Sequence, residues 1–326
     1  MTTMVTGGNG WVPSHIVRRL ARRGEHVVSY DLMEPDRYLA DMLGNAIEQV
    51  SFVQGDITDR DAMLAAAREH GVTRMIHAAV ITPRREWELR EPARIIDVNI
   101  GGTVNALDVA RSLPGFERMV YVSSCAVWGD QPDADALTET LPPNPSGLYP
   151  LSKYSSELIC RRYAELFGLD IVSMRPSNVF GPMERDTPGY RGGTEPREML
   201  RLYAAGEPIL INSLDGPWRD WTYVEDIAEG IERAWATPNL PHDVYSLTCG
   251  KLYSIGDVLA AFKRHLPELE YRVVPEGEAN YLVDGSEPGP IPSNARLNAD
   301  FGWIPTTTFD DGMRQYLEWV VANGPQ

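Results

Sequence analysis

A glycine-rich turn near the start of the chain sets the strongest constraint on its fold. The short apolar strand Met4-Val5-Thr6 runs into Gly7-Gly8-Asn9-Gly10, and a helical pattern with one apolar face follows. This order is typical of a pyrophosphate-binding turn, because a helix N-terminus attracts negative charge. Gly7 permits the tight turn and Gly10 lets the backbone approach the phosphates. The third position of the pattern holds Pro13, which a first helical turn tolerates, although its ring could displace the helix from the strand.

An acidic residue ends the second predicted strand. This strand covers residues 25–31, and Asp31 follows the glycine turn by about 20 residues. A carboxylate at that place accepts hydrogen bonds from the adenosine ribose of a dinucleotide. It would also repel a 2′-phosphate, so the sequence predicts NAD as the cofactor, in preference to NADP.

The rest of the first half alternates between strand and helix patterns. Further strands are predicted at residues 50–55, 74–80, 118–122 and 172–175, with helical patterns between them. This alternation predicts an α/β fold with a doubly wound parallel sheet. The fourth strand contains Ala78 and Ala79, whose small side chains would let a flat cofactor lie close.

Tyr149 and Lys153 are the first candidates for chemistry. They stand four positions apart in a helical pattern, so both side chains project from one face. The ammonium of Lys153 would favour the phenolate of Tyr149 and lower a pKa that is ordinarily about 10. A tyrosine tuned in this way can act as a general base near neutral pH.

Several short motifs then follow one another in a fixed order. They are Gly7–Gly10, Asp31, Asp56-Ile57, His77-Ala78-Ala79, Asn99, Ser123–Gly129, Tyr149 with Lys153, Arg175–Pro182 and Arg219–Asp226. Together they resemble the extended short-chain dehydrogenase/reductase family, in its epimerase/dehydratase branch, over nearly the whole chain. The resemblance implies a Rossmann-type sheet with a smaller mixed α/β C-terminal lobe that binds substrate. Residues 1–175 would form the NAD-binding domain, with 222–250 returning to it, and residues 176–221 and 251–326 would form the substrate-binding lobe.

The resemblance also implies roles for individual residues. Ser124, four positions before Trp128, would complete a catalytic triad with Tyr149 and Lys153. The implied NAD contacts are Gly7, Gly10, Trp11, Val12, Asp31, Asp56, Ile57, Ala78, Ala79, Asn99, Val122, Tyr149, Lys153 and Pro176. The implied substrate contacts are Ser124, Cys125, Ala126, Asn178 and Arg219.

The two residues after Ser124 narrow the reaction. Hexose-dehydrating relatives resemble one another in an Asp-Glu pair there, and decarboxylating relatives in a glutamate at the second position. Cys125 and Ala126 replace them here and disfavour both reactions. Cys125 could itself be an acid/base, but a small core residue is the preferred interpretation. Simple alcohol oxidation and 4-epimerisation remain open.

The class of substrate also stays open. Arg219 and Asn178 favour a nucleotide sugar, because they match diphosphate contacts of the related enzymes. The second arginine of those relatives is missing, and Glu287 stands in the corresponding run. Arg191 or Arg296 could compensate, but each is more often a surface charge. A free sugar or sugar acid is therefore slightly preferred, with a UDP-hexose 4-epimerase as the alternative. A non-catalytic NAD-binding sensor or scaffold is kept as an alternative of another class.

Composition excludes several partners. The 326 residues carry a net charge of −16, which argues against nucleic acid and anionic membrane surfaces. No apolar run approaches the roughly 20 residues of a membrane span. The first strand begins too early for a signal peptide, so a cytoplasmic location is expected. Three cysteines without metal-ligand spacing predict neither a disulfide nor a metal site.

Two helical segments predict an assembly. Leu151, Leu158 and Ile159 should form an exposed apolar stripe on the helix at 150–167. Relatives in the family pair this helix with the one near 92–111 in a symmetric four-helix interface. A homodimer is therefore expected.

Overall fold

A seven-stranded parallel sheet forms the centre of the computed structural model, which describes residues 1–284 and 287–324. Its strands, in spatial order, are β11 (Val244–Leu247), β7 (Ile171–Pro176), β5 (Arg118–Val122), β4 (Arg74–His77), β1 (Thr2–Thr6), β2 (His26–Asp31) and β3 (Val50–Gln54). The order reverses between β1 and β4, where open α/β sheets bind their ligands. The predicted α/β class and doubly wound parallel sheet are confirmed.

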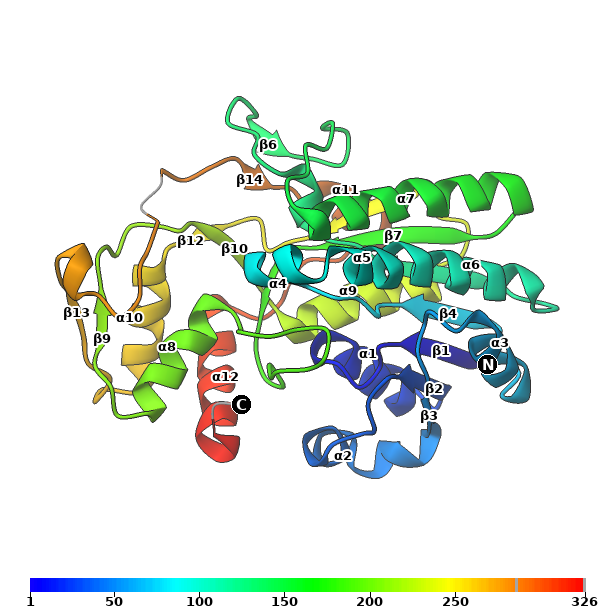
Figure 1. Cartoon of the computed structure of the whole chain (residues 1–326), viewed down its shortest axis with the longest axis horizontal. Coiled ribbons are helices and arrows are strands. Elements are labelled where there is room, and N and C mark those ends of the chain that lie inside the picture. Colours follow the sequence, from blue (N-terminus) through cyan, green and yellow to red (C-terminus); the bar gives the residue numbers. More distant parts are fainter. Residues whose placement is uncertain (285–286, 325–326) are drawn as a thin grey trace.

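Helices cover both faces of this sheet (Figure 1). On one face lie α1 (Trp11–Arg22) and α9 (Val224–Ala236), and on the other lie α3 (Arg60–Glu69), α6 (Gly102–Ser112) and α7 (Leu148–Phe167). Successive strand side chains point to opposite faces, so the neighbours Met4 and Val5 of β1 enter different core clusters. The sheet is thus buried on both sides, as its continuous apolar strands require.

Helix α1 accommodates the proline in its first turn. The helix begins at Trp11 with Gly10 as its N-cap, so Pro13 is its third residue. No intrahelical acceptor exists for an N–H at that position, and nothing is lost by removing it. Further along, Ile16, Val17 and Leu20 are fully buried against the sheet.

The remaining elements include a smaller group that lies to one side of the sheet in Figure 1. This group contains β9 (Ile209–Ile211), β13 (Tyr271–Val273), α8 (Glu195–Ala204), α10 (Ile255–His265) and α12 (Phe309–Asn323). A three-stranded sheet of β12 (Leu252–Tyr253), β10 (Arg219–Tyr223) and β8 (Asn178–Phe180) packs with it. The other elements are α2 (Arg37–Leu43), η1 (Gly44–Gln49), α4 (Arg85–Arg90), α5 (Pro92–Ile96), η2 (Asp97–Gly101), η3 (Cys125–Trp128), β6 (Ala136–Leu137), η4 (Glu276–Glu278), β14 (Ile291–Pro292) and α11 (Ala295–Phe301).

One predicted strand is longer in the sequence pattern than in the structure. The pattern places it at 74–80, but β4 ends at His77. The hydroxyl of Thr6 accepts hydrogen bonds from the backbone N–H groups of Ala78 (3.2 Å) and Ala79 (3.3 Å). These bonds turn the chain out of the sheet and across the glycine-rich turn.

His77 is buried beneath that crossing. Its Nδ1 lies 2.7 Å from the hydroxyl of Thr6, and its Nε2 lies 3.1 Å from the hydroxyl of Thr103. Burial, reinforced by the charge of Lys153, lowers the pKa of His77 from 6.5 to about 3. The neutral imidazole is therefore part of the fold.

We expect His77 to make the protein sensitive to mild acid. An unfolded chain would protonate this histidine near its ordinary pKa while the folded chain would not, so stability falls as pH falls below about 6.5. Because of this residue, the free energy of unfolding should fall by about 2 kcal/mol between pH 8 and pH 5. Urea unfolding at both pH values measures it: His77→Gln should flatten the pH dependence and His70→Gln should not. An unchanged slope in His77→Gln would contradict the assignment.

Candidate active site

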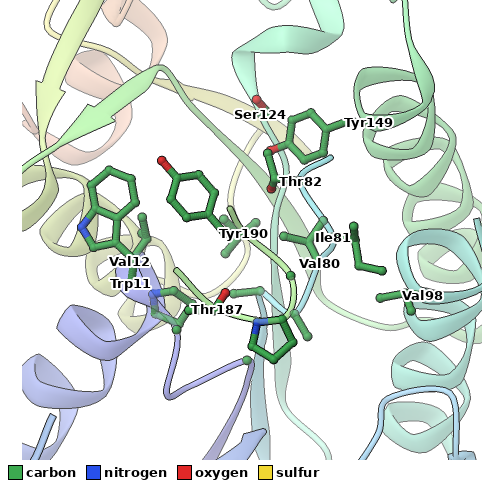
Figure 2. Close-up of a pocket in the computed structure, with 18 of the residues that line it drawn as sticks. Trp11, Val12, Val80, Ile81, Thr82, Val98, Ser124, Tyr149, Thr187 and Tyr190 are labelled. Atoms are coloured by element: carbon green, nitrogen blue, oxygen red, sulfur yellow. The ribbon is translucent and has the colours of Figure 1, made fainter. Parts of the chain in front are cut away.

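A cavity of about 710 Å³ opens at the carboxyl ends of the central strands (Figure 2). Its wall includes Gly7 after β1, Asp31 at the end of β2, Ala78 after β4 and Ser123 after β5. Residues from β8 and β10 close the opposite side. The cavity therefore joins the sheet to the smaller group of elements.

The glycine-rich turn forms one end of this cavity. Gly7 adopts φ 70°, and a Cβ atom there would lie 2.8 Å from the Cα of Ala79. A Cβ on Gly10 would lie 3.0 Å from the carbonyl oxygen of Gly7. Only glycine leaves this cradle open, and the N-terminus of α1 follows it at once. Its shape and its polarity suit a pyrophosphate.

Asp31 lies beside the cradle and lines the cavity. Its carboxylate accepts hydrogen bonds from the backbone N–H of Asn9 (3.0 Å) and of Met33 (2.9 Å). Burial raises the pKa of Asp31, while these two bonds and the charge of Arg185 oppose the rise. A carboxylate held in this way still has lone pairs for two ribose hydroxyls.

Tyr149 lies in the first turn of α7 at the other end of the cavity. Its phenol is hydrogen-bonded to the hydroxyls of Ser124 and Thr82, and Figure 2 shows these three side chains converging. Burial raises the pKa of Tyr149, and the two hydroxyls partly offset the rise. The sequence predicted Ser124 as a neighbour but missed Thr82.

Lys153 follows one helical turn later and is 3% exposed. Its ammonium donates a 2.6 Å hydrogen bond to the carbonyl of Val122 and lies 5.8 Å from the ring centroid of Tyr149. Burial lowers the pKa of Lys153 to about 7, against the opposing charge of Glu157. The predicted lowering of the Tyr149 pKa by Lys153 is not seen in this geometry. The ammonium is directed at a backbone carbonyl, and burial dominates the titration of the phenol.

Comparison with known proteins identifies the chain. Residues 3–254 match the model of the NAD dependent epimerase/dehydratase family. The chain belongs to the NAD-dependent epimerase/dehydratase family. It is therefore an enzyme of a family that uses NAD, and the cradle and Asp31 fit that cofactor. The alternative of a non-catalytic sensor has no support.

Several of the relatives are named as enzymes of nucleotide sugars. A putative UDP-glucose 4-epimerase from Methanocaldococcus jannaschii is 28% identical over 98% of both chains. A dTDP-glucose 4,6-dehydratase from Xanthomonas campestris is 25% identical over 99% of this chain and 93% of its own. A UDP-glucose 4-epimerase from Thermus thermophilus, solved with NAD, has 27% identity and a TM-score of 0.81 over 99% of this chain and 100% of its own.

Most of the expected family residues line the cavity. Of the residues expected to contact NAD, these are Gly7, Gly10, Trp11, Val12, Asp31, Asp56, Ile57, Ala78, Ala79, Val122, Tyr149, Lys153 and Pro176. Of the residues expected to contact substrate, Ser124, Ala126 and Asn178 line it. Within the described residues no helix is long and apolar enough to cross a membrane, and no group of three or more side chains could hold a metal ion.

Asn99 and Cys125 were expected to contact ligands, but neither lines the cavity. Asn99 is buried and exchanges hydrogen bonds with the backbone of Ile81 (2.8 and 2.9 Å), so it supports the cavity wall from behind. The thiol of Cys125 donates to the carbonyl of Arg175, 3.0 Å away. Burial raises the pKa of Cys125 well above its ordinary value, which agrees with its interpretation as a core residue.

Arg219 also lies outside the cavity wall. Its Nε lies 3.4 Å from the carboxylate of Glu195, and Glu195 does line the cavity. The first residue of α8 thus presents an acidic group to the cavity, and the arginine that the sequence predicted as a substrate contact is paired with it. No sequence motif marked Glu195, because it is distant from Arg219 in the chain.

A segment that the sequence analysis did not assign covers part of the cavity. This segment, residues 182–194, is called the strap below. Its Gly189 accepts a 2.7 Å hydrogen bond from the backbone N–H of Thr82, and Tyr190 lies beside Trp11 with ring centroids 5.7 Å apart. Arg185 donates to the carbonyl of Asn9, 2.8 Å away. The stretch is rich in Pro and Gly, which is typical of loops, and loops concentrate ligand contacts.

The buried carboxylate of Glu184 holds the strap in place through hydrogen bonds. Glu184 is 1% exposed. It accepts hydrogen bonds from the hydroxyls of Tyr190 and Tyr316, each 2.6 Å away, and from Thr194. Burial raises the pKa of Glu184, and these donors offset part of the rise. The strap is therefore fixed to both the cofactor turn and α12.

We expect Asp31 to select the cofactor. Wild-type protein should bind NAD at least tenfold more tightly than NADP, since a 2′-phosphate would meet the Asp31 carboxylate. Asp31→Ala should narrow that ratio by roughly tenfold, the equivalent of about 1.4 kcal/mol. Calorimetric titration of both cofactors measures the ratio. The exposed neighbour Glu34 supplies a matched control: an equal effect of Glu34→Ala would mean that general charge, and not contact, decides selectivity.

Proposed function

We propose that this enzyme oxidises a secondary alcohol of a nucleotide sugar reversibly and returns the hydride to the other face, as a 4-epimerase. The observation that carries the proposal is the convergence of Ser124 and Tyr149, with Lys153 behind them, on the wall that also contains the NAD cradle. Oxidation and epimerisation require only these groups and the cofactor. The names of the relatives favour the nucleotide sugar over the free sugar that the sequence analysis slightly preferred.

In the proposed reaction Tyr149 removes the proton from the substrate hydroxyl. Tyr149 takes this proton as the phenolate and becomes the neutral phenol. Ser124 and Thr82 donate hydrogen bonds that favour the phenolate, which is the direction in which they shift the pKa of Tyr149. Lys153 holds the nearby backbone through Val122 and supplies positive charge to the region. NAD, when bound, supplies the hydride acceptor. The protein positions the reacting carbon and tunes the proton transfer.

The residues beside Ser124 support a reaction without elimination. Dehydration needs an additional acid and base near the sugar. Ala126 has no ionisable group, and the thiol of Cys125 faces the carbonyl of Arg175 with a strongly raised pKa. These positions therefore disfavour dehydratase chemistry, even though dehydratases are among the relatives.

One observation favours a second candidate function. Glu195 brings a carboxylate to the cavity and pairs with Arg219, which weakens Arg219 as a diphosphate ligand. Net oxidation of a free sugar or sugar acid would not need that ligand. The two functions differ in cofactor balance, because an epimerase recycles NAD and a dehydrogenase accumulates NADH.

Tyr149→Phe tests the proposed chemistry. Incubation with UDP-glucose should give a 4-epimer without accumulation of NADH, and Tyr149→Phe should lower turnover by roughly 10²-fold or more. NAD binding should persist, since the phenyl ring is kept. Tyr154→Phe, the same change on α7 away from the cavity wall, serves as the control. Stoichiometric NADH without epimer would instead establish the dehydrogenase, and full turnover by Tyr149→Phe would refute the mechanism.

We also propose a division of labour and an assembly. Residues 1–175 and 222–250 would hold NAD, while residues 176–221 and 251–326 would hold the sugar. A homodimer would form through the helices near 92–111 and 150–167. Its support is the exposure of Leu151 (44%) and Leu158 (42%) on α7, although Ile159 packs partly against the core.

Charge on the α7 stripe should break the dimer. Wild-type protein should sediment as a dimer at micromolar concentration, and Leu151→Glu with Leu158→Glu should give monomers, because charges buried in a symmetric interface are costly. Val321→Glu, at an exposed aliphatic residue of α12, controls for added surface charge. A wild-type monomer would refute the proposed assembly.

A further inference from the structure

The charge balance of the cavity wall singles out one arginine of the strap. Three arginines line the cavity: Arg90, Arg94 and Arg191. Arg90 is paired with Glu91 at 2.9 Å, and Arg94 with Asp56 at 2.8 Å. Among residues 1–284 and 287–324, no acidic side chain forms an ion pair with Arg191.

One acidic residue near Arg191, Asp186, is already paired with another arginine. The positive charge of Arg191 contributes to lowering the pKa of Asp186, but Asp186 is bonded to Arg197 at 2.8 Å. The guanidinium of Arg191 instead lies over Trp87, 5.6 Å from the ring centroid. An aromatic face attracts a guanidinium without neutralising it, and it leaves the fork of N–H donors available.

The strap holds this arginine in a defined place. A tight turn joins the backbones of Thr187 and Tyr190 (2.7 and 3.2 Å) just before it. Immediately after it, the carbonyl of Gly192 accepts a hydrogen bond from Arg84. The backbone on either side of Arg191 is therefore fixed, so the side chain is presented by the cavity rim and not by a free surface loop.

Trp87 adds an unused donor to the same wall. Its indole Nε1 is buried, and the part of the chain that the structure describes offers it no hydrogen-bond acceptor. A buried N–H without a partner is unfavourable. A ligand oxygen can accept hydrogen bonds from both this indole N–H and a guanidinium.

We propose that Arg191, held over Trp87, binds the diphosphate of the substrate in this enzyme. This assignment rests on the proposed function and specifies which residue recognises its nucleotide sugar. Arg219, the arginine that the family motif suggests, is paired with Glu195 and lies outside the cavity wall. In a chain of net charge −16, an unpaired cation at a cavity rim concentrates anions there. A carboxylate of a sugar acid would present similar chemistry, so the test separates the two anions.

Matched removal of the two arginines tests the assignment. NAD-loaded wild type, Arg191→Gln and Arg219→Gln are titrated calorimetrically with UDP and, separately, with glucuronate. Arg191→Gln should weaken UDP binding by about tenfold or more, the scale of a charge-assisted contact, while Arg219→Gln should change it less than threefold. Trp87→Leu keeps Arg191 but removes the aromatic ring that supports it. The loss of UDP affinity in this variant should lie between the losses in Arg191→Gln and Arg219→Gln. With UDP-glucose as substrate, the Arg191→Gln effect should fall on KM more than on kcat.

Each other outcome has a definite meaning. No UDP binding by wild type, or a larger loss in Arg219→Gln than in Arg191→Gln, overturns the assignment. If Arg191→Gln weakens glucuronate binding but not UDP binding, Arg191 recognises a carboxylate and the diphosphate contact is overturned. If UDP binding depends on Arg191 but no UDP-sugar is converted, the contact stands and the proposed function fails. If UDP-glucose is epimerised equally by Arg191→Gln, the function stands and the contact fails.

Discussion

The close approach of two backbones, at the ends of β1 and β4, is the constraint on which the site depends. Gly7 and Ala79 are so near that a Cβ on Gly7 would lie 2.8 Å from the Cα of Ala79. Thr6 closes the same junction by bonding His77 and the two amides that follow it. A side chain at the turn would separate the strands and fill the phosphate cradle at once. The packing of the two strands and the room for a cofactor phosphate therefore both depend on the Cβ atom that Gly7 lacks.

A buried ion pair positions α7, the helix that carries Tyr149. Glu157, on α7, bonds both Nε (2.8 Å) and Nη2 (2.7 Å) of Arg175 in β7 and also accepts from Ser123 after β5. Burying such a pair brings little net stability, but its geometry is demanding. It fixes the rotation and height of α7 over two strands. The placement of Tyr149, in the first turn of that helix, follows from this attachment.

What the sequence predicted correctly is what local geometry decides. The glycine turn, the strand-end Asp31 and the spacing of Tyr149 and Lys153 each follow from a few consecutive residues. The target of the Lys153 ammonium does not, because the carbonyl of Val122 comes from another strand, 31 positions away. The pairing of Arg219 with Glu195 is tertiary in the same way. Spacing indicates which residues share a face, but not which partner a charge finds across the fold.

The strap shows why a family motif does not carry its function residue by residue. Arg185 binds the backbone of Asn9 across 176 positions, Tyr190 lies on Trp11, and Arg191 lies on Trp87. One segment thus touches the cofactor turn and the substrate side of the cavity. If a ligand at the glycine-rich turn stabilises the position of the strap, it should strengthen binding of a second ligand near Arg191. The second ligand should strengthen binding of the first equally, because coupling between binding sites is reciprocal. The contacts of Arg191 with Trp87 and of Arg219 with Glu195 are set by tertiary packing and do not follow from the motif in which either arginine stands.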